Sequence, residues 1–566
     1  MHYRELKTAW AELTAPGAPF ETATIQVRGA PMRVYKNAPP TVRELWLASA
    51  AFGDREYLVY RDERLTYADA HARVNAVAGW LVERGIQPGD RVAIAMRNYP
   101  EWLLIYWACV AMGVAVVGMN AWWVADEMAF AIEDSEPKVI FCDAERLSRL
   151  GERAGMAGEA AVVAVRADDP PPGATPWSEV IAHGGALPHV TIDPDDDACI
   201  FYTSGTTGFP KGAQLTHRGC VHNLMSMMFS GQVTALATQR ATGTVPDPAA
   251  PPPIPVSLLA TPLFHVTANN CAAYALTAGG GKMILMYRWD AGEALRLMER
   301  EKVTSFGGVP VMSRELINHP DFAKTDLSSL MSLGGGGSQL PPDLVARIDA
   351  SVETARPSTG YGMTETCGII TAIAADFFVD KPASAGPAMP CFEVRCVDDD
   401  SNTVGPGEIG ELWVRGAQVI KGYINRPEAT AEAIGDGWLH TGDVARVDAD
   451  GFLFIVDRKK DMVIRGGENI YCAEVEGCVY RHEAVAECCV FGVLDERMGE
   501  EVAIAVVLRE GRRMSGADLR AHLGEITARH KIPRYIWFLA DPLPRNASGK
   551  FLKRELRERL ALDQAA

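Results

Sequence analysis

Short apolar runs alternate with amphipathic stretches in the first 142 residues, and this alternation restricts the fold more than any other feature of the chain. Runs typical of buried strands lie at 91–96, 114–119 and 138–142. The stretch Thr66–Arg84 predicts an amphipathic helix with a Thr-x-x-Asp capping pair at its start. Strands that alternate with helices form a parallel sheet covered on both faces, so we expect an α/β protein.

The stretch Trp102–Met119 contains eighteen uncharged, largely apolar residues, which is the length of a membrane-spanning helix. We interpret it as a buried helix, a turn at Gly113 and a buried strand, since sheets covered on both faces contain continuous apolar runs. A transmembrane helix is the alternative interpretation. The first ten residues carry charge where a signal peptide has its apolar core, so export is not expected.

Length, cysteine content and charge narrow the class of protein. A chain of 566 residues exceeds one hydrophobic core, so two or more domains are expected. Its twelve cysteines include no C-x-x-C pair, which predicts neither a zinc site nor a disulfide framework and favours a cytoplasmic location. The net charge of −17 argues against nucleic acid as a partner, because binding it needs basic surfaces. A monomer or a homodimer, and a peripheral association with membranes, remain open.

One stretch combines glycine, hydroxyl and lysine side chains directly after an apolar run. It is YTSGTTGFPKGA at 202–213. Glycine lets the backbone approach an anion, hydroxyl groups donate hydrogen bonds to it, and Lys211 adds positive charge, so the stretch predicts a polyphosphate site. It is not a Walker A loop, because Pro210 occupies the place of the second glycine. A solvated Ser/Thr/Gly linker is the alternative.

Three further motifs follow along the chain. They are STGYGMTETCG at 358–368, WLHTGDVARVDADGFLFIVDRKKDMVIRGGENIY at 438–471 and PRNASGKFLKREL at 544–556. Taken singly, they read as a turn, a solvated charge run and an exposed lysine. With the stretch at 202–213 they closely resemble, in order and context, the AMP-forming adenylating enzymes, the family of acyl-CoA synthetases, firefly-type luciferases and peptide-synthetase adenylation domains. The resemblance extends over roughly residues 40–560.

This resemblance implies a fold and a division into domains. Residues 1–459 are expected to form a domain of parallel α/β sheets with a small β-barrel-like part, which binds AMP and the acyl group. Residues 460–566 are expected to form a small mobile α+β domain, with Lys460 as the hinge.

The resemblance also implies a set of nucleotide-binding residues. Tyr361 offers a planar face to adenine, Asp443 a carboxylate to the ribose hydroxyls, and Glu365 a hard oxygen to magnesium. The complete ATP- or AMP-binding set is Thr203, Ser204, Gly205, Thr206, Thr207, Gly208, Lys211, Gly336, Gly337, Ser338, Tyr361, Gly362, Met363, Thr364, Asp443 and Arg458.

Lys550 is similar to the catalytic lysine of the family. Attack of a carboxylate on the α-phosphorus of ATP brings two anions together, so catalysis consists mostly of charge neutralisation and alignment. Glu365 and His265 are implied to take part with Lys550. Rotation about Lys460 is implied to withdraw Lys550 and to bring in a loop of small residues that leaves room for pantetheine. The implied CoA-binding residues are Gly466, Gly467 and Glu468.

The acyl pocket implied by the resemblance consists of His265, Val266, Thr267, Val309, Gly336 and Gly362. For His265, a hydrogen-bonded core histidine is an equally weighted alternative. Phe264–Thr267 offers no acidic partner for an amino group, which favours an uncharged acyl tail. Gly362 stands where acetate-specific relatives have tryptophan, so we expect an open pocket.

The predicted reaction is activation of a carboxylic acid by ATP and Mg²⁺ to acyl-AMP, with release of pyrophosphate, followed by transfer to coenzyme A. Medium- to long-chain fatty acids are the first choice of substrate, and aryl acids of the coumarate or benzoate type are the second. A carrier-protein thiol or an amine as acceptor, a luciferase-like oxidation and a non-catalytic nucleotide-binding regulator remain alternatives.

Overall fold

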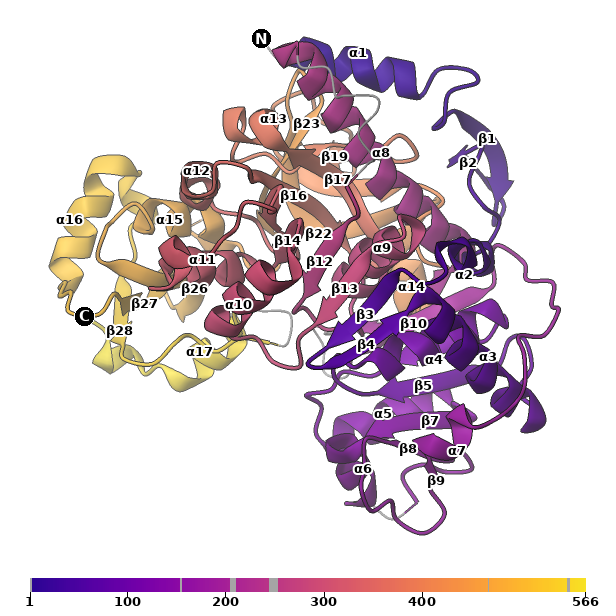
Figure 1. Ribbon diagram of the computed structural model, residues 1–566. Coiled ribbons are helices and arrows are strands. Elements are labelled where there is room, and N and C mark those ends of the chain that lie inside the picture. Colours follow the sequence, from indigo (N-terminus) through magenta and orange to yellow (C-terminus); the bar gives the residue numbers. More distant parts are fainter. Residues whose placement is uncertain (1–2, 153–154, 204–209, 244–252, 467, 547–549) are drawn as a thin grey trace.

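The computed structural model describes residues 3–152, 155–203, 210–243, 253–466, 468–546 and 550–566. Within these residues the strands form five sheets (Figure 1). The first large sheet has seven strands, which in spatial order are β11 (Lys211–Thr216), β10 (Asp197–Thr203), β6 (Ala115–Gly118), β5 (Arg91–Ala95), β7 (Val139–Asp143), β8 (Ala161–Val165) and β9 (Thr175–Pro176).

Neighbouring strands of this sheet are parallel, except for the antiparallel pair β10–β11. The helices that connect and cover its strands are α3 (Tyr67–Glu83), α4 (Pro100–Ala111), α5 (Ala125–Ser135), α6 (Ala144–Gly151) and α7 (Trp177–Ile181). The predicted capping pair is present, since Thr66 and Asp69 exchange hydrogen bonds at the start of α3. The α/β prediction is therefore confirmed, including the strands expected from the apolar runs.

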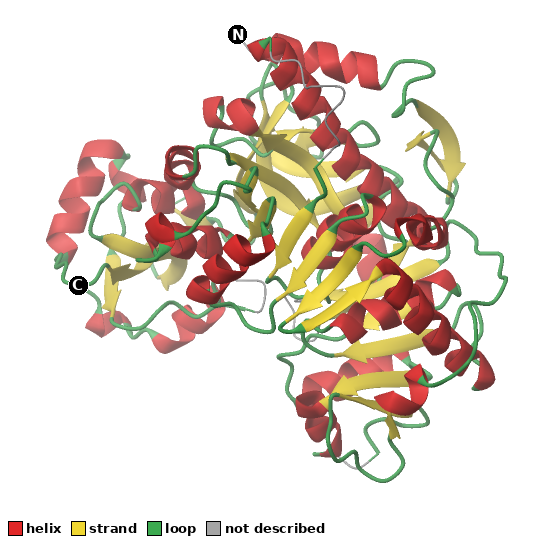
Figure 2. Ribbon diagram, viewed as in Figure 1, coloured by secondary structure: helices red, strands yellow, loops and turns green. Residues whose placement is uncertain are grey.

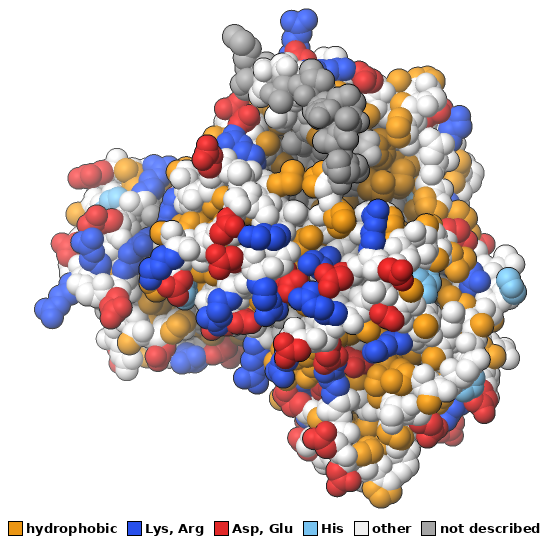
Figure 3. Space-filling model, in the orientation of Figure 1, with side chains coloured by type: hydrophobic (Ala, Val, Ile, Leu, Met, Phe, Trp, Pro, Cys, Tyr) orange, Lys and Arg blue, Asp and Glu red, His pale blue; other side chains and the backbone are white. Residues whose placement is uncertain are grey.

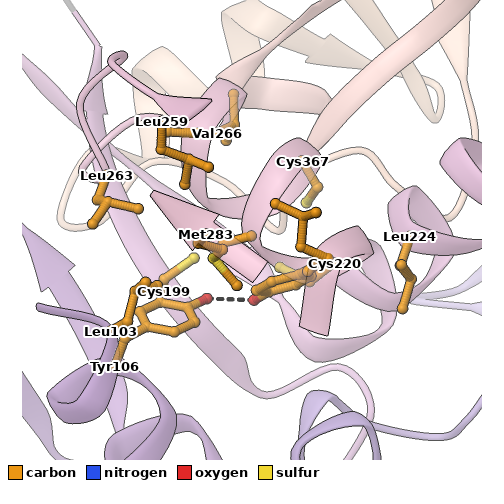
Figure 4. Packing of buried hydrophobic residues seen from close by; sticks show 14 of the residues in the cluster. Leu103, Tyr106, Cys199, Cys220, Leu224, Leu259, Leu263, Val266, Met283 and Cys367 are labelled. Atoms are coloured by element: carbon orange, nitrogen blue, oxygen red, sulfur yellow. Dashed lines mark hydrogen bonds between the residues drawn. The ribbon is translucent and has the colours of Figure 1, made fainter. Parts of the chain in front are cut away.

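The apolar stretch at 102–119 forms the buried helix α4 and the buried strand β6. All twelve residues of α4 are buried. Tyr106 on this helix hydrogen-bonds through its hydroxyl to the hydroxyl of Tyr274, which lies on α9 (Tyr274–Ala278) (Figure 4). Among the described residues, no helix combines the length and the apolar character that crossing a bilayer requires.

The second large sheet has eight strands, which in spatial order are β17 (Gly368–Ala374), β16 (Arg356–Met363), β15 (Ser332–Gly335), β14 (Ser305–Gly308), β12 (Val256–Leu259), β13 (Lys282–Leu285), β3 (Glu56–Tyr60) and β4 (Glu63–Thr66). It is parallel except at its two edges, β16–β17 and β3–β4. Its helices are α2 (Val42–Ser49), α8 (His217–Thr242), α9, α10 (Ala291–Glu301), α11 (Pro310–Asn318), α12 (Pro342–Ser351) and α13 (Ala375–Asp380).

A smaller antiparallel sheet stands where the barrel-like part was expected. Its strands are β18 (Gly386–Pro387), β23 (Phe452–Arg458), β22 (Trp438–Val447), β20 (Gly410–Arg415) and β19 (Glu393–Val397), with β21 (Ile434–Gly435) beside β22 and helix α14 (Pro427–Ala433) nearby in sequence. The N-terminal segment forms α1 (Tyr3–Leu13), which packs on α8, and the hairpin β1 (Thr22–Val27) and β2 (Ala30–Tyr35).

The C-terminal segment forms a fifth sheet that is separate from the others, at the left of Figure 2. Its strands are β25 (Glu468–Ile470), β24 (Val463–Arg465), β27 (Gly499–Leu508), β26 (Val485–Asp495) and β28 (Tyr535–Leu539). Helices α15 (Cys472–Val479), α16 (Gly516–Ile526) and α17 (Lys553–Arg559) accompany it, and it has buried cores of its own. The domain boundary at 460 and the hinge at Lys460 stay predictions.

Charged side chains of both signs lie interspersed over the face shown in Figure 3. All twelve cysteines are free thiols, and eleven of them are buried. The pair Cys488–Cys489, for example, lies inside β26.

Candidate active site

A cavity of about 230 Å³ lies where the eight-stranded sheet, the small antiparallel sheet and the segment carrying Lys550 meet. Its wall contains seven of the residues predicted from the sequence. They are Gly337, Ser338, Tyr361, Gly362, Asp443, Arg458 and Lys550. The fold thus brings together side chains from four distant segments of the chain.

The Asp443 carboxylate is the centre of the polar network in this cavity. Its Oδ2 accepts a hydrogen bond of 2.6 Å from the Tyr361 hydroxyl, and its Oδ1 lies 3.0 Å from Nε of Arg458. Asp443 and Arg458 are opposite residues on the paired strands β22 and β23. Burial, and then the Asp443 carboxylate, raise the pKa of Tyr361 well above its ordinary value, so the phenol remains a donor. Each carboxylate oxygen keeps a second lone pair, with which Asp443 can accept a hydrogen bond from a diol.

The four glycines at 334–337 divide into two pairs. A Cβ on Gly334 would lie 2.3 Å from the carbonyl oxygen of Ser358, and one on Gly335 would lie 2.9 Å from a leucine side chain. A Cβ on Gly336 or Gly337 would have its nearest neighbour at 4.0 or 3.8 Å. The first pair is therefore required by packing around β15, whereas the second borders open space, where the nucleotide and acyl wall is predicted.

Gly362 lines the cavity, yet its lack of a side chain has another physical cause. A Cβ at this position would lie 1.9 Å from the carbonyl oxygen of Gly368 on the neighbouring strand. β16 and β17 change register between Tyr361 and Gly362, and their backbones approach closely there. Glycine is needed at this position by the pairing of two strands, whatever the size of the acid. The open pocket that we expected from Gly362 rests on the resemblance alone.

Glu365 is buried in a short 3₁₀-helix, Thr364–Thr366, directly after the predicted nucleotide residue Met363. Its Oε1 accepts a hydrogen bond of 2.8 Å from the hydroxyl of Tyr423. The ammonium of Lys211 lies over the Tyr423 ring, 5.2 Å from the centroid. Tyr423 therefore connects the predicted metal carboxylate with the predicted phosphate-binding lysine.

The donor set around Glu365 suits magnesium in a nucleotide site. In the described part of the chain, no group of three His, Cys, Asp or Glu side chains is arranged to hold a metal ion. Magnesium in such sites is commonly bound by one or two carboxylates together with water and the phosphates of the substrate. A single buried carboxylate fits that role.

Lys550 reaches the cavity from the segment between β28 and α17. Its side chain is accessible to solvent, but burial of its ammonium, and then the positive charge of Arg458, lower its pKa to about 8. The carboxylates of Asp443 and Glu365 oppose this shift. The Lys550 N–H donates to the side chain of Asn546, and the Asn546 N–H donates to the Lys550 carbonyl, each at 2.9 Å.

His265 follows β12 and precedes a turn of π-helix at Thr267–Ala273. Its Nε2 is buried and has no hydrogen-bond partner among the described residues. Burial, and then the charge of Lys550, lower its pKa to about 4, so the ring is neutral at pH 7. The alternative of a hydrogen-bonded core histidine does not apply to Nε2, which has no such bond among the described residues.

The predicted phosphate-binding stretch is described only at its ends. Thr203 and Lys211 are opposite residues on β10 and β11, and Oγ1 of Thr203 donates to the carbonyl of Lys211 at 3.4 Å. Five predicted residues lie outside the described part of the chain, namely Ser204, Gly205, Thr206, Thr207 and Gly208.

The predicted CoA-binding residues lie away from this cavity. The N–H of Gly466 donates to the carbonyl of Met498 at 2.8 Å, and Glu468 is exposed at the start of β25. Neither belongs to the wall of the cavity, and Gly467 lies outside the described residues. In the predicted acyl pocket, Val266 and Val309 are buried.

Comparisons with known proteins identify the family. The family described as AMP-binding enzyme matches residues 45–424, and the one described as AMP-binding enzyme C-terminal domain matches residues 474–550.

The chain belongs to the AMP-binding enzyme family.

This AMP-binding enzyme has similar proteins over most of its length. A feruloyl-CoA synthase of an Amycolatopsis species is 38% identical, over 88% of this chain and 94% of that protein. A long-chain-fatty-acid–CoA ligase of Mycobacterium tuberculosis is 33% identical, over 88% and 93%. The solved structure of an o-succinylbenzoate–CoA synthetase of Bacillus subtilis, in complex with ATP and magnesium ion, has a TM-score of 0.74 at 28% identity and covers 91% of this chain and 99% of its own.

Reasoning from the sequence missed several residues around the cavity of this AMP-binding enzyme. Tyr423 contacts Glu365 from a loop without any recognised motif. Asp457 lines the cavity and accepts a hydrogen bond from the N–H of Cys472 at the start of α15. In the sequence, the only indication that Asp457 belongs to the site is its position next to the predicted residue Arg458. The remaining cavity residues that we did not predict are Gln339, Leu340, Thr359, Gly360, Phe378, Ala383, Ser384, Ala385, Ile455, Val456 and Ala473.

Proposed function

We propose that this protein is an AMP-forming acid–thiol ligase, which activates a carboxylic acid with ATP and transfers the acyl group to coenzyme A. The observation that carries the proposal is the position of Lys550 in one cavity with Tyr361, Asp443 and Arg458. A regulator that only binds nucleotide has no need of a lysine whose pKa is lowered to about 8 beside Arg458.

The first step is attack of a carboxylate oxygen of the acid on the α-phosphorus of ATP. The bond from that phosphorus to the oxygen bridging to the β-phosphate breaks, and pyrophosphate leaves with the electron pair. Lys550 offsets the negative charge that gathers around the α-phosphate, while Asp443 and Arg458 fix the ribose and Tyr361 supports the adenine. These roles are supported by the shared cavity.

In the second step the thiol sulfur of coenzyme A attacks the acyl carbonyl carbon, its proton passes to solvent, and AMP leaves with the electrons of the C–O bond. We propose that residues 460–566 rotate about Lys460 between the two steps. One contact that such a rotation must break is the hydrogen bond from the Cys472 N–H to Asp457.

Glu365 would hold the magnesium ion of the substrate. When bound, the ion neutralises charge on the phosphates and aligns the leaving group. Tyr423 keeps the Glu365 carboxylate in one orientation through its hydrogen bond of 2.8 Å.

For the acid, we propose an uncharged acyl tail. The printed names of the relatives support both classes weighed from the sequence, since one acts on ferulate and another on long-chain fatty acids. Two observations favour an aryl acid. Of these two relatives, feruloyl-CoA synthase is the more similar to this chain. The aromatic rings of Trp122 and Phe264 also lie together beside His265, and their centroids are 5.5 Å apart. An aryl acid is therefore the first substrate to try, and a fatty acid is the second.

The test is release of pyrophosphate with ATP and magnesium over a panel of ferulate, coumarate, benzoate, C2 to C18 fatty acids and amino acids, each with and without coenzyme A. We expect turnover that depends on coenzyme A and is highest for one class of ring or chain length. Pyrophosphate release without a thioester would move the acceptor to a carrier protein or an amine. If no acid of the panel gave pyrophosphate release, the result would contradict the proposed ligase activity.

A further inference from the structure

The hairpin of β1 and β2 carries none of the predicted site residues and lies before residue 45, where the match to the family begins. It stands outside both large sheets, at the upper right of Figure 1. Its buried side chains pack against Ala417 and are Val27, Met32 and Val34. Ala417 belongs to the loop of residues 416–423, which follows β20 and includes Tyr423, the partner of Glu365. We call this loop the support loop.

Arg28 lies in the turn of the hairpin, in a backbone conformation that does not suit an arginine. The turn consists of Arg28 and Gly29, since Val27 pairs with Ala30. The φ angles of the two turn residues are 49° and 83°. Asn-Gly is the favoured pair in hairpin turns where both residues have positive φ, because most side chains crowd the backbone there. Strain of this kind at an arginine points to a purpose of its side chain.

The guanidinium of Arg28 reaches the support loop. Its Nη2 donates a hydrogen bond of 2.7 Å to the carbonyl oxygen of Val419. The N–H of the next residue, Ile420, donates at 2.9 Å to the carbonyl oxygen of Glu365. The Val419 carbonyl and the Ile420 N–H are the two ends of one planar peptide group, so a single rigid unit joins Arg28 to Glu365. A charged donor at the carbonyl end also polarises this group and strengthens the hydrogen bond at its N–H end.

The support loop thus holds Glu365 at two atoms. The Ile420 N–H binds its backbone carbonyl, and the Tyr423 hydroxyl donates to Oε1 of its carboxylate at 2.8 Å. Both contacts come from one short loop, so a shift of the loop would move both of them. The orientation of a ligating carboxylate, and the groups that hydrogen-bond to it, decide how well it binds an ion.

We propose that Arg28 is a positioning residue for the magnesium site and acts through the Val419–Ile420 peptide group. The inference rests on the proposed role of Glu365 in holding the magnesium ion of the substrate. Arg28 does not belong to the wall of the cavity that contains Lys550, so its effect passes through the support loop. Without the guanidinium, the Val419 carbonyl loses its charged donor and the loop is less restrained on the side of the hairpin.

Three variants separate the guanidinium from the rest of the hairpin. Arg28→Met removes the hydrogen bond and keeps an unbranched side chain in the strained turn. Arg28→Asn also removes it but supplies the favoured Asn-Gly turn, so the hairpin should be at least as stable as in the parent. The matched control is Arg33→Met, because Arg33 lies on the same hairpin and donates at 3.4 Å to the carbonyl of Phe392, outside the support loop.

The first measurement is hydrogen exchange of the support-loop amides in the protein without ligands, followed by mass spectrometry. The Ile420 N–H is protected by its hydrogen bond to Glu365. Exchange in a peptide that covers residues 416–423 should be roughly tenfold faster in both Arg28 variants, because a less restrained loop opens more often. It should be unchanged in Arg33→Met. This readout involves neither magnesium nor turnover.

The second measurement is the magnesium concentration that gives half-maximal ATP binding by calorimetry and half-maximal adenylation. In both Arg28 variants it should rise roughly three- to tenfold, no more than after loss of a direct partner of the metal ligand. The kcat at saturating magnesium should stay close to that of the parent, whereas a protein that is only destabilised would lose activity at every magnesium concentration. Arg33→Met should match the parent throughout.

The inference is overturned if folded Arg28→Met, or Arg28→Asn in its place, exchanges its loop amides and depends on magnesium like the parent. It is also overturned if only Arg28→Asn behaves like the parent, since the turn would then be the cause, or if Arg33→Met shows the same losses. Faster exchange with an unchanged magnesium dependence contradicts it as well. Failure of the ligase proposal differs from all of these, because the parent protein would then release no pyrophosphate with any acid.

Discussion

The hydroxyl of Tyr361 and the carboxylate of Asp443 are joined by a hydrogen bond of 2.6 Å between residues 82 positions apart. This contact ties the edge of the eight-stranded sheet to the small antiparallel sheet at the cavity. It fixes the carboxylate that we expect to bind ribose, and Arg458 holds the other oxygen of the same group at 3.0 Å.

Tyr361→Phe tests this relationship. The ring and its stacking surface remain, but Asp443 loses a donor and gains rotational freedom. A hydrogen bond to a charged group is worth about 1.5 kcal/mol or more, so we expect the KM for ATP to rise about tenfold with little change in the unfolding midpoint. Steady-state kinetics of pyrophosphate release measure it. An unchanged KM for ATP would show that the carboxylate does not need Tyr361 for its orientation.

Lys550→Ala separates the two half-reactions. One ammonium about 4 Å from an anion contributes about 4 kcal/mol at an effective dielectric of 20, so adenylation should slow by about three powers of ten. Thioester formation from preformed acyl-AMP should continue, because we propose that Lys550 acts in adenylation alone. Rapid-quench assays of each half-reaction measure the two rates. Equal loss of both would contradict the division of roles.

The lowered pKa of Lys550, about 8, predicts a pH dependence. Above that pH the free enzyme loses the ammonium, so kcat/KM for ATP in the adenylation half-reaction should fall as pH rises through about 8. Lys550→Arg keeps its charge throughout this range, and any activity that it retains should show no such fall. If kcat/KM for ATP of the parent enzyme stayed constant up to pH 10, the positive charge needed for adenylation would belong to a group other than Lys550.

Tyr423→Phe tests the support of Glu365. The ring below Lys211 remains, while the hydrogen bond of 2.8 Å to the carboxylate is lost. Since an unrestrained carboxylate binds an ion less well, half-saturation with magnesium should need roughly tenfold more of the ion. Titration of adenylation activity and of MgATP binding by calorimetry both report it. Tyr423 has no such role if the magnesium dependence of the two proteins coincides.

Gly362→Ala and Gly336→Ala form a matched pair. The added methyl group meets the Gly368 carbonyl oxygen at 1.9 Å in the first variant and has its nearest neighbour at 4.0 Å in the second. Overpacking predicts a loss of about 1–3 kcal/mol and a lower unfolding midpoint for Gly362→Ala. Gly336→Ala should retain the parental midpoint and show altered KM for the acid or ATP. Calorimetric unfolding compares the two variants. If Gly362→Ala were as stable as the parent, strand packing would not explain this glycine, and its predicted role in the acyl pocket would be the remaining explanation.

The sequence by itself determined the central strands of the first sheet and two of the helices that cover it. Apolar runs and a capping pair are local signals, and they predicted α3, α4, β5 and β7 because periodicity and burial act over a few residues. Four motifs in family order further led to Tyr361, Asp443 and Lys550, which the fold brings into one cavity.

Only the tertiary structure decided what surrounds these residues. Tyr423 and Glu365 lie 58 positions apart, and the sequence of neither segment predicts the hydrogen bond between them. The reason for glycine at 362 lies in the backbone of the neighbouring strand. Hydrogen-bond partners, burial and the electrostatics that follow from them depend on distances that the order of residues does not contain, and folding alone sets those distances.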